Sequence, residues 1–197
     1  MARSTSPRSL AKKKPQTSLI LLEEVGGKGR GVFAGRDIAA QEEVLEFLGN
    51  IVDVSELEDL THALQIGPRE FLTSSGDVDD YVNHSCEPNC GIRNDDHRVV
   101  LFALRDIAKD DEITFDYSTT QTGGFWSMLC QCGSAKCRGM IGDFQDLPVN
   151  TKAFYERQGA VLTYLIEEPG VKPSKVSNDE YKSGRRSRKK PIPARNC

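Results

Sequence analysis

The sequence predicts a mainly β fold with few short helices, because three of its features point the same way. Short segments rich in β-branched and aromatic residues recur along the 197 residues, and turn-forming residues separate them at close intervals. Segments with helical periodicity are scarce. Strands do not alternate with helices, as they do in α/β nucleotide-binding folds. We therefore expect one mainly β domain of roughly 125–150 residues.

Six segments are expected to form strands, and glycine-rich or polar stretches bound most of them. Residues 26–31 hold four glycines and are predicted to be a loop, without the strand–helix context of a phosphate-binding loop. Residues 105–111 are predicted to be a polar turn. The predicted strands are residues 19–23, 32–34, 44–52, 70–72, 99–104 and 112–117.

Two helices are expected. Residues 55–65 have Ser55 as a candidate N-cap, and Glu58 three residues later completes a capping box. Residues 152–167 carry spaced apolar side chains and predict a terminal helix. From residue 169 onward Pro, Ser, Lys and Arg dominate, so order is expected to end there.

Charge divides the chain into a body and two arms. The net charge is −3, but residues 1–22 carry +5 and residues 172–197 carry +7, which leaves −15 for the body between them. An acidic body favours a cationic substrate, and basic arms favour an anionic partner or an import receptor. Solvated disordered tails would explain the arms equally well. We expect a basic disordered arm over residues 1–17 and a basic disordered tail over residues 169–197.

Targeting signals and cysteine usage limit the class of protein. No apolar run approaches the ~20 residues of a membrane span, and residues 19–22 are too few for a signal-peptide core. The protein is therefore expected to be soluble, without membrane contact, and made in a reducing compartment. Six cysteines in that setting indicate metal binding in preference to disulfides.

Two clusters of polar and thiol side chains carry candidate chemistry. Residues 81–90 combine two amides, an imidazole, a hydroxyl and two thiols, although turn formers alone could produce such a stretch. Residues 130–137 hold three cysteines in a CxCx4C pattern, which suits tetrahedral Zn²⁺ better than three unrelated buried thiols. Zn²⁺ needs a fourth ligand. Cys86 and Cys90 are the candidates, and Cys197 in the basic tail is a poor one.

The predicted strand over residues 112–117 reads EITFDY. Alternation places Ile113, Phe115 and Tyr117 on one face, with Thr114 and Asp116 on the other. An aromatic strand of this kind is usually core, so by itself the segment does not indicate a site.

The chain resembles the SET-domain protein-lysine methyltransferases with a post-SET zinc segment. Four motifs carry the resemblance, in this order: KGRGVFA (28–34), NHSCEPN (83–89), EITFDY (112–117) and CQCGSAKC (130–137). The resemblance covers residues 18–145. It implies a SET-domain β-clip fold with a pseudoknot over residues 18–120, a post-SET zinc-binding segment over 121–145 and a C-terminal helical extension over 146–168. The activity that it implies is methyl transfer from S-adenosylmethionine to a lysine amine.

The resemblance also implies roles for individual residues. Tyr117 is the expected catalytic tyrosine, and Phe115 leaves room for di- or trimethylation. Trp126, its neighbour Phe125 and Leu129 are candidates for a pocket wall, although plain packing explains Trp126 as well. The implied zinc ligands are Cys86, Cys130, Cys132 and Cys137, with Cys90 left as a buried thiol. The implied cofactor-binding residues are Lys28, Gly29, Arg30, Gly31, Tyr81, Asn83, His84 and Tyr117.

The chain departs from the family pattern at three positions. Phe47 and Asn50 stand where relatives carry Tyr and Glu, and Asp80 stands where many carry Arg. Loss of the tyrosine hydroxyl could weaken the site, and Asp80 could alter cofactor affinity.

Three functions follow from these observations. The first is lysine methylation of a basic protein, with a histone tail ahead of ribosomal or other basic proteins. The second, supported by Phe47 and Asp80, is a catalytically weak or inactive chromatin-binding module. The third is nucleic-acid binding through residues 184–190, which we expect to be only a weak accessory contact or a nuclear-import signal. Nuclear residence is expected, with the cytoplasm as the alternative.

Overall fold

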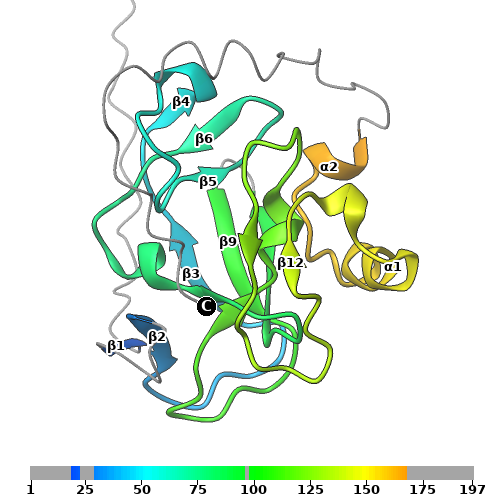
Figure 1. Cartoon of the computed structure of the whole chain (residues 1–197). Helices are drawn as coiled ribbons and strands as arrows, with labels where there is room; N and C mark the ends of the chain where they lie inside the picture. The colour runs from blue at the N-terminus through cyan, green and yellow to red at the C-terminus, as the bar shows by residue number, and fades with distance from the viewer. Residues whose placement is uncertain (1–18, 23–28, 96–97, 168–197) are drawn as a thin grey trace, which may run out of the picture.

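The computed structural model describes residues 19–22, 29–95 and 98–167, and Figure 1 shows their arrangement. The predicted mainly β fold with few short helices is confirmed. The two basic arms, Lys28 and Cys197 lie outside the described residues. No helix in the described ranges is long and apolar enough to cross a membrane.

The described residues form short strands joined by turns and single-turn helices. The strands are β1 Leu19–Leu22, β2 Gly31–Ala34, β3 Glu43–Phe47, β4 Ile51–Asp53, β5 Leu64–Gln65, β6 Glu70–Leu72, β7 Asn83–His84, β8 Cys90–Asp95, β9 Arg98–Ala103, β10 Thr114–Phe115, β11 Met128–Leu129 and β12 Met140–Ile141. The 3₁₀ helices are η1 Val54–Glu56, η2 Val78–Tyr81, η3 Tyr117–Thr120 and η4 Phe144–Asp146, and the α-helices are α1 Val149–Gln158 and α2 Tyr164–Glu167.

The strands form several small sheets, and β9 is the central strand of one of them. Strand β9 pairs with β3 and β8, while β4, β6 and β5 form a second three-stranded sheet. β9 is buried along most of its length, with Leu101 in the main core and Phe102 in a second cluster beneath α1 and α2. In Figure 1 the β4–β6–β5 sheet lies at the top and the two α-helices at the right. The C-terminal helices therefore pack on the same strand that supports the main core.

Parallel pairing between β7 and β10 joins the two segments of the expected pseudoknot. Thr114 pairs with Asn83 and Phe115 with His84, and the N–H of Ser85 donates to the carbonyl of Phe115 at 3.1 Å. This pairing brings the polar segment 81–90 against the predicted aromatic strand. It also places the end of that strand, where Tyr117 begins η3, at the centre of the molecule.

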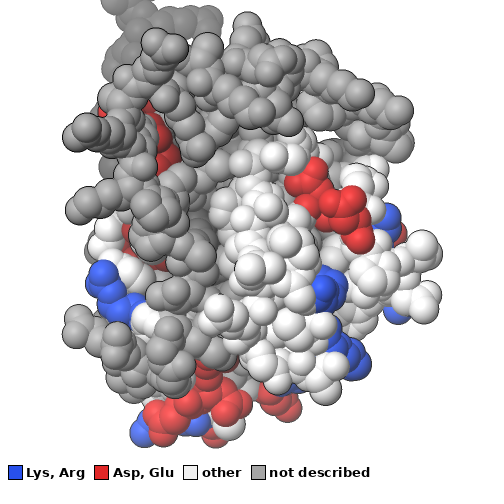
Figure 2. Space-filling view, in the orientation of Figure 1, with Lys and Arg blue, Asp and Glu red and all other residues white. Residues whose placement is uncertain are grey.

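Loops at the lower end of Figure 1 carry most of the carboxylates visible on this face in Figure 2. Ile38 and Ile107 form an isolated antiparallel bridge there. Carboxylates of the loops accept backbone hydrogen bonds across the bridge, from Lys109 to Asp37 at 2.9 Å and from Ala40 to Asp106 at 2.8 Å. The predicted polar turn over 105–111 is therefore confirmed as part of an acidic end.

Four predicted elements differ from the structure. The helix over 55–65 is wrong, because Asp53 caps the short η1 instead and β5 follows. The terminal helix over 152–167 is split by Gly159, which adopts φ 61° and ends α1. The strand over 112–117 is shorter than predicted, since Tyr117 already belongs to η3. The strand over 44–52 is two strands in different sheets, β3 and β4.

Gly49 is the reason that the 44–52 segment divides. Its φ is +147°, and a Cβ at this position would lie 2.2 Å from the carbonyl oxygen of Thr73. We therefore expect Gly49→Ala to lower the free energy of unfolding by more than about 2 kcal/mol. The matched control is Gly76→Ala, with φ +75° and nothing within 4 Å, which should cost only about 1 kcal/mol. Urea unfolding of both variants measures the difference, and equal losses would contradict the expectation.

Candidate active site and metal centre

An aromatic cluster surrounds the start of η3. The ring of Phe115 lies 4.9 Å from that of Tyr117 and 5.6 Å from that of Phe47. His84 and Trp126 approach Tyr117 at 5.3 and 5.8 Å between ring centroids. β10 and β7 fix this cluster, because Phe115 and His84 are register partners across them. The two predicted catalytic residues therefore lie together.

The hydroxyl of Tyr117 has a defined partner. It donates a hydrogen bond of 2.7 Å to the backbone carbonyl of Val82, and the residue is only 5% exposed. A phenolic oxygen that donates in this way can also accept hydrogen bonds. The arrangement can orient a small polar or cationic group brought near Tyr117.

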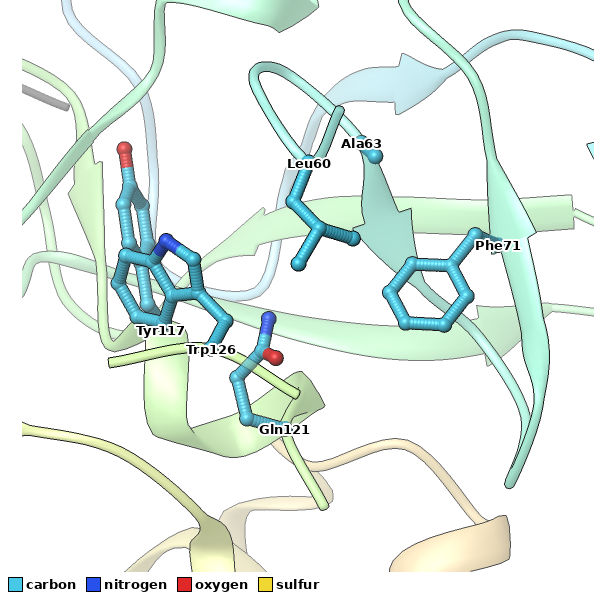
Figure 3. Close-up of a pocket in the computed structure, with 6 residues that line it drawn as sticks. All are labelled: Leu60, Ala63, Phe71, Tyr117, Gln121 and Trp126. Atoms are coloured by element: carbon cyan, nitrogen blue, oxygen red, sulfur yellow. The ribbon is translucent and has the colours of Figure 1, made fainter. Parts of the chain in front are cut away.

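A pocket with an empty volume of about 240 Å³ opens beside Tyr117. Figure 3 shows Tyr117 and Trp126 side by side, with Leu60 and Phe71 opposite them. Its remaining lining residues are Ala63 and Gln121. Four of the six lining residues have apolar side chains, while Tyr117 and Gln121 supply polar groups, so a charged group entering the pocket would lose part of its hydration. Of the expected wall residues, Trp126 lines this pocket, Phe125 packs on Phe71 at 6.0 Å and Leu129 is 70% exposed.

A second pocket adjoins the other face of Phe115. It has an empty volume of about 310 Å³, and Phe47, Val82 and Asp79 are among its lining residues. Asp79 is buried and accepts from the N–H of Leu48 at 2.9 Å. Burial raises the pKa of the Asp79 carboxyl. Phe115 therefore lines this second pocket and contacts the Tyr117 ring at 4.9 Å, so its side chain affects the space on that side of Tyr117.

The glycine-rich turn packs against Asn83. The Nδ2 of Asn83 donates to the carbonyl of Arg30 at 3.1 Å and to Oε1 of Glu112 at 2.8 Å. A Cβ on Gly31 would lie 2.9 Å from the same Glu112 oxygen, so a larger residue here would have to displace the Glu112 carboxylate from Asn83. Gly29 has φ 77°, which also favours glycine. The turn is thus held beside β7 by side-chain contacts from two other segments.

Arg30 and Tyr81 stack beside this turn. The guanidinium carbon of Arg30 lies 4.0 Å from the centroid of the Tyr81 ring, a cation–π distance. The structure therefore brings together Gly29, Arg30, Gly31, Tyr81 and Asn83 from the predicted cofactor set. Lys28 lies outside the described residues.

His84 links the aromatic cluster to the thiols. Its Nδ1 accepts the backbone N–H of Tyr117 at 3.2 Å, and its Nε2 lies 3.4 Å from the Sγ of Cys86. Burial lowers the pKa of His84 to about 4, although nearby Asp116 opposes this, so the ring is neutral at pH 7. A neutral ring that accepts at Nδ1 carries its proton on Nε2. In this tautomer Nε2–H faces the Sγ of Cys86 as a donor.

The ligand atoms of His84, Cys86, Cys130 and Cys132 all lie within 4.8 Å of one another. The Sγ atoms of Cys86 and Cys130 are 3.8 Å apart. Two thiolates on one tetrahedral Zn²⁺, each at ~2.3 Å, would be separated by about 3.8 Å, so the spacing fits. Backbone N–H groups of Cys132 and Arg138 lie 3.4 Å from the Sγ of Cys130 and Cys86 respectively. Such donors stabilise thiolates.

The other two cysteines of the described chain differ in their surroundings. Cys137 is exposed, and its Sγ lies 3.9 Å from the carbonyl of Cys130. It therefore lies beside the four clustered ligand residues but is not one of them. Cys90 is fully buried in β8, as expected for a thiol without a metal role. Burial raises its pKa to about 12, which keeps it protonated at neutral pH.

A buried ion pair beside the site was not predicted from sequence. Arg138 donates two hydrogen bonds of 2.7 Å to the carboxylate of Asp116, which is only 1% exposed. The hydroxyl of Tyr155 donates to the same carboxylate at 2.9 Å. The sequence offered one signal: Asp116 stands between two aromatic residues, and an aspartate in a buried segment needs partners.

Comparison with known proteins agrees with this geometry. Residues 29–118, which hold the glycine turn, Asn83, His84 and Tyr117, match the model of the SET domain. A SET domain therefore spans residues 29–118 of this chain. The thiols of Cys130 and Cys132 lie beyond the matched residues, directly after the SET domain.

Two curated relatives and one solved structure illustrate the similarity. The histone-lysine N-methyltransferase ATX2 of Arabidopsis thaliana is 32% identical over 140 residues, covering 60% of this chain and 12% of that protein. SUV39H2 of Xenopus tropicalis is 28% identical over 170 residues, covering 68% and 42%. A crystal structure of KRYPTONITE with mCHH DNA, an H3(1–15) peptide and SAH is 26% identical, with a TM-score of 0.51 and coverage of 62% and 29%. The chain thus spans less than half of these relatives.

Proposed function

We propose that the chain is an S-adenosylmethionine-dependent protein-lysine N-methyltransferase. The observation that carries this proposal is the Tyr117 hydroxyl, bonded to the Val82 carbonyl between the glycine turn and an apolar pocket. Two curated relatives are named histone-lysine N-methyltransferases, which supports the same activity.

The cofactor is expected on the side of the glycine turn. Gly29 and Gly31 allow close approach of a ligand to the backbone, and Tyr81 and Arg30 offer a stacked surface beside it. The imidazole of His84 is occupied by Tyr117 and Cys86, so its contribution to binding would come from its backbone. SAH in the KRYPTONITE complex supports this class of cofactor. When bound, S-adenosylmethionine would supply a methyl group on a sulfonium; the lysine nitrogen would attack that methyl carbon in line as the S–C bond breaks.

The apolar pocket would prepare the lysine amine. A lysine with an ordinary pKa near ~10.4 must lose its proton before it can attack, and burial favours the neutral form. Leu60, Phe71 and Trp126 supply that apolar surface, and the proton leaves to solvent. Tyr117 then orients the amine and the polarised methyl group at its hydroxyl. No strong base is required, because the leaving group departs as a neutral thioether.

We propose a histone tail as the substrate class, with other basic proteins as the alternative. The body between the arms carries −15, which favours a cationic peptide. The H3(1–15) peptide in the KRYPTONITE complex supports the same choice. Nuclear residence is proposed with it, and weak nucleic-acid contact is proposed for residues 184–190. Truncation of that segment should weaken salt-dependent DNA binding without loss of methyl transfer.

A catalytically weak or inactive chromatin-binding module is the second candidate. Phe47 favours it, because it packs on Phe115 at 5.6 Å and lacks the hydroxyl that relatives place there. Asp80 is weaker support. Its carboxylate accepts from the backbone of Ser75 at 3.1 Å and of Gly76 at 2.8 Å, so it stabilises a turn of its own.

The deciding experiment measures labelled methyl transfer from S-adenosylmethionine to an H3(1–15) peptide and to whole core histones. The matched control is the same peptide with each lysine replaced by arginine. Label on the lysine peptide alone supports the proposal. Cofactor binding by calorimetry without label on histones or on other basic proteins would favour the inactive module.

We propose that Cys86, Cys130, Cys132 and Cys137 hold a structural Zn²⁺. The ligand atoms of Cys86, Cys130 and Cys132 already lie close together, and exposed Cys137, whose Sγ lies 3.9 Å from the carbonyl of Cys130, would be the fourth thiolate. A bound metal would fix the segment after the SET domain against β7.

Metal content distinguishes the cysteines. We expect Cys137→Ser and Cys132→Ser to retain less than about half of the wild-type zinc after dialysis against a chelator, because three thiolates bind Zn²⁺ less tightly than four. Cys90→Ser should retain it, since Cys90 is buried away from the thiol group. Zinc is measured by atomic emission. Full retention in Cys137→Ser, together with loss in His84→Gln, would instead establish histidine as the fourth ligand.

The degree of methylation is proposed to depend on Phe115. Phe115 lines the second pocket, packs on Tyr117 and carries no hydroxyl, which favours space for further methyl groups beside Tyr117. We expect wild-type protein to form di- or trimethyl-lysine and Phe115→Tyr to stop mainly at monomethyl-lysine. Mass spectrometry of the product at saturating cofactor measures this. Only monomethyl-lysine from the wild type at long times would contradict the expectation.

A further inference from the structure

Asp116 is a buried carboxylate that four donors surround. Its side chain has no exposed surface. Arg138 donates two hydrogen bonds of 2.7 Å, the Tyr155 hydroxyl donates one of 2.9 Å, and the N–H of Ser118 donates one of 3.1 Å. The donors come from three segments, because Ser118 belongs to η3, Arg138 directly follows Cys137, and Tyr155 belongs to helix α1. One carboxylate therefore joins both C-terminal segments to the SET domain.

The same carboxylate sets the start of the helix that carries Tyr117. Asp116 is the N-cap of η3, and Tyr117 is the first residue of that helix. Oδ1 of Asp116 also lies 3.6 Å from Nδ1 of His84, the atom that accepts the N–H of Tyr117. The backbone of Tyr117 is thus fixed from both sides, and a shift of Asp116 would move the phenol.

Arg138 connects this arrangement to the thiols. Its side chain bonds Asp116, while its backbone N–H lies 3.4 Å from the Sγ of Cys86. Because the guanidinium is planar and donates two hydrogen bonds, it fixes the orientation of the Asp116 carboxylate as well as compensating its charge. The position of the thiol segment and the position of Asp116 are therefore coupled through one residue.

We propose that Asp116 is a positioning residue through which the thiol segment and helix α1 hold Tyr117 in its working position. The proposal rests on the proposed methyltransferase function and adds a dependence on residues beyond the matched SET domain. It does not require contact between Asp116 and any substrate. Its consequence is that a change in α1, on the far side of Asp116 from the pocket, alters turnover.

Tyr155→Phe tests this with a matched control. Tyr164→Phe also removes one buried hydroxyl from a C-terminal helix, but Tyr164 donates to the carbonyl of Thr120 at 2.6 Å and not to Asp116. We expect Tyr155→Phe to lower kcat about tenfold with KM nearly unchanged, because small misplacements of catalytic groups are costly. Tyr164→Phe should keep wild-type kcat at a similar loss of stability, and both variants should keep wild-type zinc content.

Trp126 supplies a readout that does not depend on activity. It is the single tryptophan of the chain, and its ring lies 5.8 Å from that of Tyr117. Acrylamide quenching of its fluorescence should increase in Tyr155→Phe and stay unchanged in Tyr164→Phe. Equal effects of the two variants, or none in Tyr155→Phe, would overturn the proposal. A wild-type protein without methyl transfer would refute the proposed function, while the quenching comparison would still decide the positioning role.

Discussion

Tyr117→Phe is expected to reduce methyl transfer by about 10²–10³-fold while cofactor affinity stays near the wild-type value. The substitution removes only the hydroxyl, which donates to the Val82 carbonyl at 2.7 Å. The ring contacts with Phe115, His84 and Trp126 remain, so the aromatic cluster keeps its packing. The lost oxygen is the group that would orient the amine and the methyl group. Single-turnover rates with saturating S-adenosylmethionine measure the effect directly.

Tyr155→Phe serves as the chemical control for this substitution. It removes a phenolic hydroxyl of similar burial that lies on the far side of Asp116, so its effect should be much smaller. Binding of S-adenosylmethionine to each variant is measured by calorimetry. A Tyr117→Phe protein with more than a tenth of wild-type turnover would show that the hydroxyl is not the orienting group.

Local sequence was sufficient where a short segment determines its own structure. The strand over 70–72 and the polar turn over 105–111 are predicted from the local pattern alone. Residues 26–28 of the predicted glycine-rich loop lie outside the described residues. The family resemblance added the residues that only the fold brings together, such as Asn83 beside Gly31. It also implied the pseudoknot, whereas the parallel pairing of β7 with β10 is a finding of the structure, because no local pattern predicts a two-residue parallel contact.

The errors arose where distant contacts decide the backbone. Gly49 looked like part of one strand, yet the approach of Thr73 makes it a break between two sheets. Residues 55–65 had a capping signal, but Asp53 rather than Ser55 caps the turn. Both Asp53 with Glu56 and Ser55 with Glu58 have the residue types of a capping box. Only tertiary packing selects between the two pairs.

Individual site residues could be predicted only where they belong to one of the family motifs. Asp116 stands inside EITFDY and was assigned only to a strand face, because its partners Arg138 and Tyr155 are 22 and 39 residues away. Pairing at such separations is invisible to periodicity. His84 was assigned to the cofactor, whereas its imidazole joins Tyr117 to Cys86. The missed interactions are therefore those that connect separate motifs.

Arg138→Met is expected to lower the free energy of unfolding by roughly 3–5 kcal/mol, the usual cost of breaking a buried ion pair from one side. Arg138 is 17% exposed in its side chain, and the Asp116 side chain is fully buried. Methionine fills a similar volume but leaves the carboxylate with only Tyr155 and Ser118 as donors. The measurement is urea unfolding at neutral pH, with zinc content determined on the same samples.

Two further variants separate charge from packing. Asp116→Asn combined with Arg138→Met removes the buried charge as well as its partner, so it should recover part of the loss that Arg138→Met alone causes. Arg69→Met breaks an ion pair with Asp53 in which both side chains are well exposed, and it should change stability far less. If Arg138→Met were no more harmful than Arg69→Met, Asp116 could not be the point at which the C-terminal segments are anchored. Tyr117 would then have to be positioned by β7 and β10 alone.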